Sequence, residues 1–180
     1  MSDFNDDLLS DLDLDMDLDA IEMDPEFVDL TAGSYILRIA GATNKPIELE
    51  NDDGDTVPSS RLSIVFQIVQ VLAAEMPAPE PGGLFTVGGI MAYKRARSQV
   101  FGLATKAVKL ANPDFFSVKR TPRGLIQEVI RLYSDINLLE CNITLRNEKY
   151  PQIRTMRLRD MTNAEVDWDS YQKAEFEFHG

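Results

Sequence analysis

Cysteine, histidine and tryptophan are scarce in this 180-residue chain, which has one of each. The single Cys141 cannot form a disulfide within the chain. It lies in an apolar run, so we expect a core residue rather than a nucleophile. The only histidine, His179, is one residue from the end, so a Ser-His or Cys-His pair would depend on the last residues.

Motifs that carry enzyme chemistry are also missing from the sequence. The chain has no GxxxxGK[ST] phosphate loop, no HExxH and no CxxC pair. Asp52, Asp53 and Asp55 surround a glycine, but the twelfth position counted from Asp53 is Ile64 rather than the glutamate of a calcium loop. We therefore predict no enzyme, no cofactor and no metal site. A metal-dependent nuclease is the enzyme alternative that remains.

Long apolar runs are absent as well. No stretch approaches the roughly 18 apolar residues of a membrane span, and no basic segment leads into an apolar run as in a signal peptide. We expect a soluble protein of a reducing compartment, with no membrane partner. That compartment is the cytoplasm, or the host cell's cytoplasm if the chain is phage-encoded.

Positive charge is absent from the first 29 residues, which hold ten Asp and two Glu. These twelve acidic residues account for the whole net charge of -12. Within the neutral remainder, residues 94–159 carry 14 basic and 5 acidic residues. The acidic start therefore conceals a basic half-domain that can attract a polyanion.

The acidic start alternates Asp with Leu or Met and repels itself, so residues 1–26 are predicted to form a disordered acidic tail. It is either a solubilising tail or a docking segment for a basic, partly apolar groove. Residues 27–160 are predicted to form one domain. Residues 161–180 form an acidic, aromatic segment that could cap the domain, pair along a sheet edge or stay mobile.

Hydrophobic periodicity divides the domain into strands and helices. Short β-rich runs predict strands over residues 34–43, 61–72, 84–91, 138–146 and 152–159, with an acidic loop over 44–60. Apolar residues at spacings of three and four predict a helix from about Ala96 to Ala111. Thr121 and Pro122 predict the start of a second helix as N-cap and first residue. The fold class is mainly β with a helical insert (α+β): a five-stranded OB-fold-like barrel with helices between strands 3 and 4.

Basic and aromatic residues are interleaved three times in the second half of the domain. Proteins that bind single strands without reading sequence need cations for phosphates and flat rings for unpaired bases. Tyr93, Phe116 and Tyr150 are the stacking candidates, although each could instead be a core or ordinary surface residue. The predicted nucleic-acid-binding residues are Tyr93, Lys94, Arg95, Arg97, Lys106, Phe116, Lys119, Arg120, Arg123, Arg146, Lys149, Tyr150, Arg154 and Arg157.

Two motifs resemble a family of phage single-stranded-DNA-binding proteins of OB-fold type. One is the segment FVDLTAGSY over residues 27–35, whose Leu-x-Ala-Gly-x-Tyr turn leads into the first strand, and the other is the strand LSIVFQIV over residues 62–69. The resemblance covers residues 27–69, and the longest acidic tract here is N-terminal rather than C-terminal. It implies a protein that coats exposed strands in replication or recombination and recruits partner proteins through its acidic tail.

The leading hypothesis is thus a non-catalytic single-stranded DNA-binding protein, with an acidic tail for partner recruitment or autoinhibition. RNA in place of DNA and a homo-oligomeric state are left open. The alternative is a protein-interaction module, such as a phage inhibitor or adaptor, whose acidic tail mimics DNA.

Overall fold

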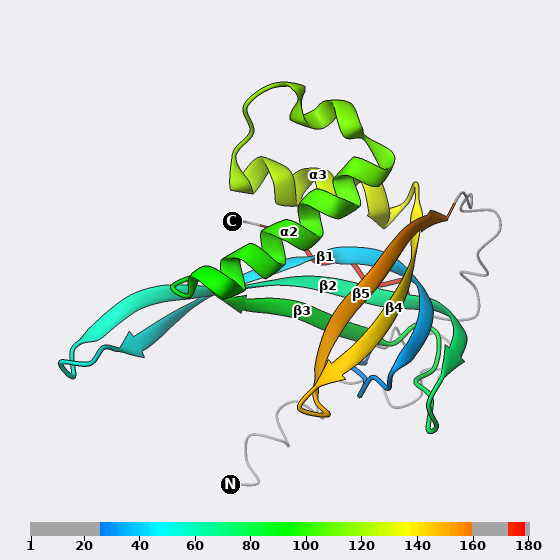
Figure 1. The fold of residues 1–180 in the computed structure, drawn as a ribbon, viewed down its shortest axis with the longest axis horizontal. Coiled ribbons are helices and arrows are strands. Elements are labelled where there is room, and N and C mark those ends of the chain that lie inside the picture. The colour runs from blue at the N-terminus through cyan, green and yellow to red at the C-terminus, as the bar shows by residue number, and fades with distance from the viewer. Residues whose placement is uncertain (1–25, 160–172, 179–180) are drawn as a thin grey trace, which may run out of the picture.

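A five-stranded antiparallel sheet with two helices on one face makes up the domain (Figure 1). The computed structural model describes residues 26–159 and 173–178. The predicted acidic tail, apart from Glu26, and residues 160–172 lie outside the described residues.

The strands are β1 (Gly33–Glu50), β2 (Thr56–Ala74), β3 (Leu84–Ile90), β4 (Leu138–Arg146) and β5 (Tyr150–Arg159). The helices are α2 (Lys94–Ala111), the short 3-10 helix η2 (Pro113–Ser117) and α3 (Pro122–Ser134). In the chain, α2, η2 and α3 follow β3 and precede β4. The sheet order is β3-β2-β1-β4-β5.

The α+β class is confirmed, but the sheet is not closed into a barrel. The edge strands β3 and β5 approach each other, yet the structure has no hydrogen-bonded pairing between them in the described residues. The helices are also placed differently from a barrel's insert: α2 lies against β3 and β5 along the open side, and α3 packs on β1 and α2. Five predicted strands do not determine whether the two edge strands pair, because closure of a sheet into a barrel depends on its twist and on the register between strands.

The main core fills the space between the sheet and the helices. Leu37, Ile64 and Phe66 from the strands meet Val108 and Val129 from the helices. The predicted N-cap of α3 is confirmed, because the Thr121 hydroxyl accepts a hydrogen bond from the Gly124 amide at 3.0 Å. The first helix begins at Lys94, two residues earlier than predicted.

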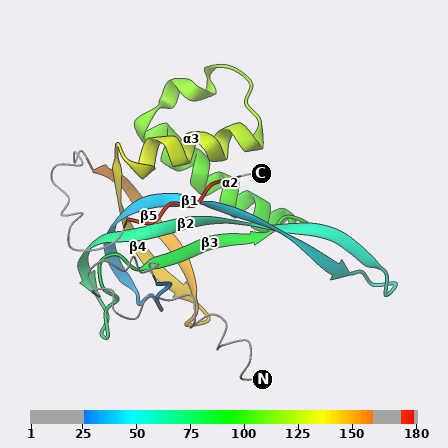
Figure 2. The ribbon, with the colours of Figure 1, turned by 180° about the vertical axis from the view of Figure 1, so that it is seen from behind.

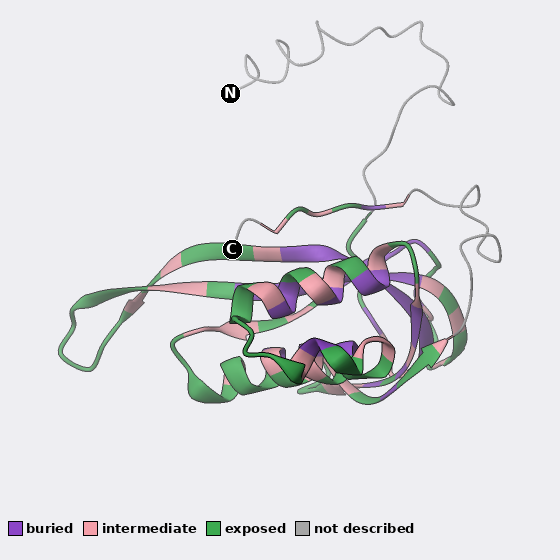
Figure 3. Ribbon diagram, turned by 90° about the horizontal axis from the view of Figure 1, so that it is seen from above, coloured by how far each residue is buried: buried purple, intermediate pink, exposed green. Residues whose placement is uncertain are grey.

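Residues 44–60, predicted to be a loop, are the ends of two long strands. β1 pairs with β2 from Gly33 to Glu50, so the hairpin projects from the body as a two-stranded arm (Figures 1 and 2). Most of its residues are exposed (Figure 3). The prediction failed because the acidic and glycine residues, typical of loops, are concentrated at the arm's tip, where Asn51 to Asp55 form the turn.

Residues 173–178 lie alongside β1 and are here called the strap. The Phe176 amide donates to the Ala40 carbonyl at 2.7 Å, in a parallel bridge with Gly41. This part of the predicted C-terminal segment therefore pairs along a sheet edge, one of the three arrangements that the sequence left open.

Candidate nucleic-acid interface

A cleft of about 650 Å³ lies where the open side of the sheet meets the start of α2. Its walls come from β2, β3, the first two turns of α2 and the β4–β5 hairpin. Glycine makes this close approach of helix and strand feasible, because a Cβ on Gly89 would lie 2.5 Å from the Ala96 Cβ. The cleft lies between the edge strands β3 and β5, which do not pair with each other in the described residues.

Two exposed tyrosines line the cleft from different elements. Tyr93 is the N-cap residue of α2 and is 57% exposed. Tyr150 is the first residue of β5 and is 48% exposed. The β4–β5 turn places Tyr150 here through Asn147 and Glu148, which both adopt positive φ (53° and 59°). The tyrosines are 57 residues apart in the chain, so this part of the predicted site is assembled by the fold.

Three arginines line the same cleft: Arg61 from β2, Arg95 from α2 and Arg146 from the end of β4. The Arg146 guanidinium carbon lies 5.4 Å from the centre of the Tyr150 ring, and the Lys149 ammonium lies 5.6 Å from it. None of the described residues that line the cleft is acidic. The described lining of the cleft therefore combines exposed aromatic rings with side chains of positive charge only.

A smaller hollow of about 310 Å³ continues from the cleft between α2 and β5. It shares Gln99 and Gln152 with the cleft and adds Lys106 and Arg154. The Arg154 side chain is held by Thr144 Oγ1 at 2.8 Å and Gln152 Oε1 at 2.9 Å. α2 has five basic residues and no acidic one: three lie within its first four residues and two within its last six.

Four predicted residues lie elsewhere, on the segment between the helices and at the start of α3: Phe116, Lys119, Arg120 and Arg123. Phe116 is half-buried against Phe115, with the Lys109 ammonium 5.6 Å from its ring centre. The Arg120 side chain donates to the Phe115 carbonyl at 2.6 Å. From Tyr93 to Lys109, α2 rises about 24 Å at 1.5 Å per residue. Lys109 and Arg120, which contact Phe116 and Phe115, therefore form a second basic region at the other end of α2. Lys119 is exposed next to Arg120 in the chain, whereas Arg123 lines a hollow with Met91 and Phe101.

The remaining predicted cations do not line the cleft. Lys94 and Arg97 are exposed in the first turn of α2. Arg157 is engaged in an ion pair with Glu140 at 2.5 Å, while Arg159 lies 3.9 Å from the same carboxylate. The charge of Arg157 is thus offset by Glu140.

Sequence reasoning missed Arg61, Gln99 and Gln152 in the cleft. Arg61 stands alone at the start of an apolar run, 33 residues before the basic cluster, so a search for clustered cations does not find it. Its signal was its position, because a single cation directly before a buried apolar run marks the point where β2 leaves the core.

Cys141 is buried in β4, as predicted, and burial raises the pKa of its thiol to about 12. No group of three or more potential metal ligands occurs within residues 26–159 and 173–178. Over the same residues no helix has the length and apolar character needed to cross a membrane. His179 lies outside the described residues.

Comparisons with protein-family models, curated proteins and solved structures found no match to this chain.

Proposed function

We propose that the protein binds single-stranded DNA in the cleft, without catalysis and without reading sequence. The observation that carries this proposal is the cleft's composition: two exposed tyrosines and three arginines, with no acidic residue among the lining residues described. Rings of this kind can stack on unpaired bases, and arginines can contact the phosphates between them. The adjoining hollow with Lys106 and Arg154 offers the strand a path along α2.

Within the α+β class, the strand order supports the inference of an OB-like fold. OB-folds are five-stranded, partly open barrels with a helical element between the third and fourth strands. In this protein β3 and β5 approach each other at the open side, and the helices fall at that place in the chain. We infer an OB-like sheet that is open between β3 and β5, with the cleft at the opening.

The biological setting follows from the proposal and from the resemblance of residues 27–69. The protein would coat strands exposed during phage replication or recombination, in the host cytoplasm. Its acidic tail would recruit other replication or recombination proteins or occupy the basic surface.

Fluorescence polarisation of labelled oligo-dT tests the proposal, with and without magnesium and at several salt concentrations. Binding without cleavage supports it, whereas cleavage would indicate a nuclease. Absence of binding at low salt would reject it and favour the protein-interaction module. Oligo-U in parallel distinguishes DNA from RNA.

A matched pair of arginine variants locates the site. We expect Arg146→Ala to weaken oligo-dT binding, because this arginine lies beside Tyr150 in the cleft. Arg131→Ala is the control, since Arg131 lies on α3 and pairs with Glu128. Equal affinity losses in the two variants would indicate a diffuse charge effect and exclude this cleft as the site.

A further inference from the structure

The strap occupies an edge of β1 that β4 leaves uncovered. β4 pairs with β1 only from Gly33 to Leu37. Beyond Leu37, the strap pairs with β1 instead: the Phe176 amide donates a hydrogen bond to the Ala40 carbonyl. Gly41 permits this contact, because its φ is +147° and a Cβ there would lie 1.8 Å from the Phe176 carbonyl oxygen. This edge is therefore shaped to accept an extended segment closely, as in β-strand addition.

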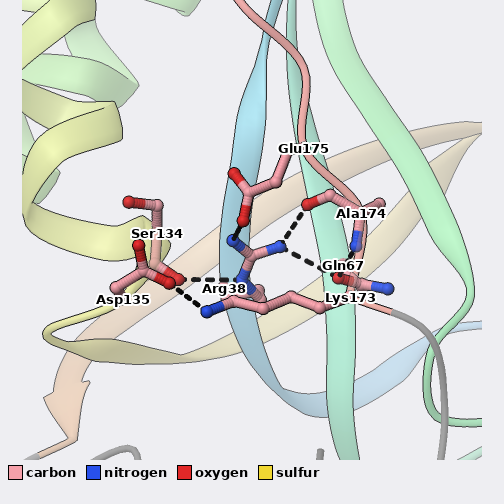
Figure 4. A network of polar contacts seen from close by, with 7 residues as sticks. All are labelled: Arg38, Gln67, Ser134, Asp135, Lys173, Ala174 and Glu175. Carbon is pink, nitrogen blue, oxygen red and sulfur yellow. Dashed lines mark hydrogen bonds and ion pairs between the residues drawn. The ribbon is translucent and has the colours of Figure 1, made fainter.

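Arg38 supplies the polar part of the same contact (Figure 4). Its side chain is completely buried, and one guanidinium nitrogen donates to the Ala174 carbonyl at 2.5 Å and to Gln67 at 3.0 Å. Another nitrogen pairs with the Glu175 carboxylate at 2.9 Å. The Gln67 side-chain oxygen also accepts from the Ala174 amide at 3.1 Å. A buried arginine needs such partners, since an unpaired buried charge is strongly destabilising.

The strap presents apolar and acidic residues alternately. Ala174 and Phe176 pack against Ala40, Val65 and Leu84. Phe178 lines a small hollow formed by α2, α3 and the base of the arm. Glu175 and Glu177, between them, are exposed. The strap site, defined as Arg38, Ala40, Gly41 and Gln67, thus selects an extended segment with apolar residues at alternate positions and a carboxylate beside Arg38.

The same alternation occurs in residues 11–20, DLDLDMDLDA, here called the tract. Three registers of the tract reproduce the apolar-acidic-apolar-acidic-apolar order of residues 174–178: residues 12–16, 14–18 and 16–20. The described chain begins beside the strap, because the Phe27 ring centre lies 6.2 Å from that of Phe176. A segment tethered so near has a high effective concentration at the strap site.

We propose that the strap site is a peptide-binding site for alternating acidic and apolar segments, and that the tract competes with the strap for it. The strap is the resident occupant because Ala174 fits a position that is 95% buried, where Leu or Met from the tract would be overpacked. When the tract binds, an aspartate takes the place of Glu175 beside Arg38. This inference does not depend on nucleic-acid binding.

Hydrogen exchange of the full chain, followed by mass spectrometry, tests the competition. In the tract variant, Leu12, Leu14, Met16 and Leu18 are replaced by Ser, which keeps every aspartate and leaves the body untouched. We expect exchange of the Ala174 and Phe176 amides to slow at least threefold, because the strap has lost its competitor. The control replaces Leu8, Leu9, Ile21 and Met23 by Ser, which removes as many apolar residues outside the alternation.

A second variant tests occupation by the tract directly. Phe176→Ala with Phe178→Ala weakens the strap, and we expect amides 11–20 to exchange at least threefold more slowly than in the wild type. Unchanged strap exchange in the tract variant would overturn the proposal. An equal change of strap exchange in the control variant would overturn it as well. The proposal would also fail if, in the Phe176→Ala and Phe178→Ala variant, the core amides stay protected and the tract amides gain no protection.

Discussion

Tyr93 and Tyr150 are the residues on which the proposed binding of bases depends most. Each projects from a point where a regular element begins, and each is about half exposed. We expect Tyr93→Ala and Tyr150→Ala each to weaken oligo-dT binding by about 1–3 kcal/mol, the usual loss for one stacked base. Fluorescence polarisation measures the loss, and an unchanged melting temperature shows that the fold is intact.

Phe116→Ala provides the comparison, because Phe116 was predicted as a third stacking residue but lies half-buried beside Phe115. A loss of affinity in Phe116→Ala larger than in both tyrosine variants, with the fold intact, would place the site on the segment between the helices instead.

Cys141 gives a prediction about stability rather than binding. We expect Cys141→Ser to lower the free energy of unfolding by about 1–3 kcal/mol, because a hydroxyl is placed in an apolar strand. Denaturant unfolding measures this cost, while oligo-dT affinity at low temperature stays unchanged. Rapid labelling of the native thiol at neutral pH by a bulky reagent would contradict the burial.

The thiol also gives stability a dependence on pH. Burial raises the pKa of Cys141 to about 12 in the folded protein, whereas an unfolded thiol titrates near 8.5. Between these values the unfolded state loses the proton first, so the free energy of unfolding falls as the pH rises through this window. Cys141→Ser should reduce this part of the alkaline loss.

At the scale of elements, the arm is the part of the fold with the clearest electrostatic consequence. The arm carries five acidic residues: Glu48, Glu50, Asp52, Asp53 and Asp55. Arg61, which lines the cleft, lies at the base of the arm. We expect replacement of residues 48–58 by Asn-Gly, a two-residue hairpin turn, to raise oligo-dT affinity at low salt. An isolated two-stranded ribbon is marginally stable, so the free energy of unfolding should change by less than about 1 kcal/mol.

A full-length arm with the five acids changed to Asn or Gln separates charge from shape. Its affinity should match that of the shortened protein. If only the shortened arm binds more tightly, steric obstruction rather than charge repulsion is the cause.

The sequence predicted elements better than their arrangement. The helices were found because apolar spacing and the Thr121 cap are local signals, and Cys141 was placed in the core for the same reason. The arm was missed because charge and Pro or Gly content do not distinguish a solvated hairpin from a loop. The barrel was wrong, and the sequence did not predict that Tyr93 and Tyr150 line the same cleft, because both features depend on how distant strands meet.

At the scale of the whole molecule, charge is unevenly distributed: residues 1–29 hold twelve acidic residues and no basic one, whereas residues 94–159 carry 14 basic and 5 acidic residues. Deleting residues 1–25 removes nine Asp and Glu22 and keeps Glu26, whose carbonyl accepts from the Leu84 amide at 2.9 Å. We expect the deletion to raise oligo-dT affinity most at low salt, since screening weakens occupation of the basic surface by the tail.

The ratio of the two affinities across a salt series is the quantity to measure, because phosphate contacts weaken with salt as well. A ratio of one at every salt concentration would show that the tail never occupies the nucleic-acid site.

The long strands of the sheet join the arm to the core without a break. β1 has 18 residues, about 60 Å of extended chain, and its register irregularities against β2 all fall between Ser34 and Gly41. Beyond Gly41 the pairing is regular to the tip. A bulge interrupts the hydrogen-bond ladder and bends the strand, so the β1–β2 ribbon bends most readily at this last irregularity, where the strap meets β1 at Gly41.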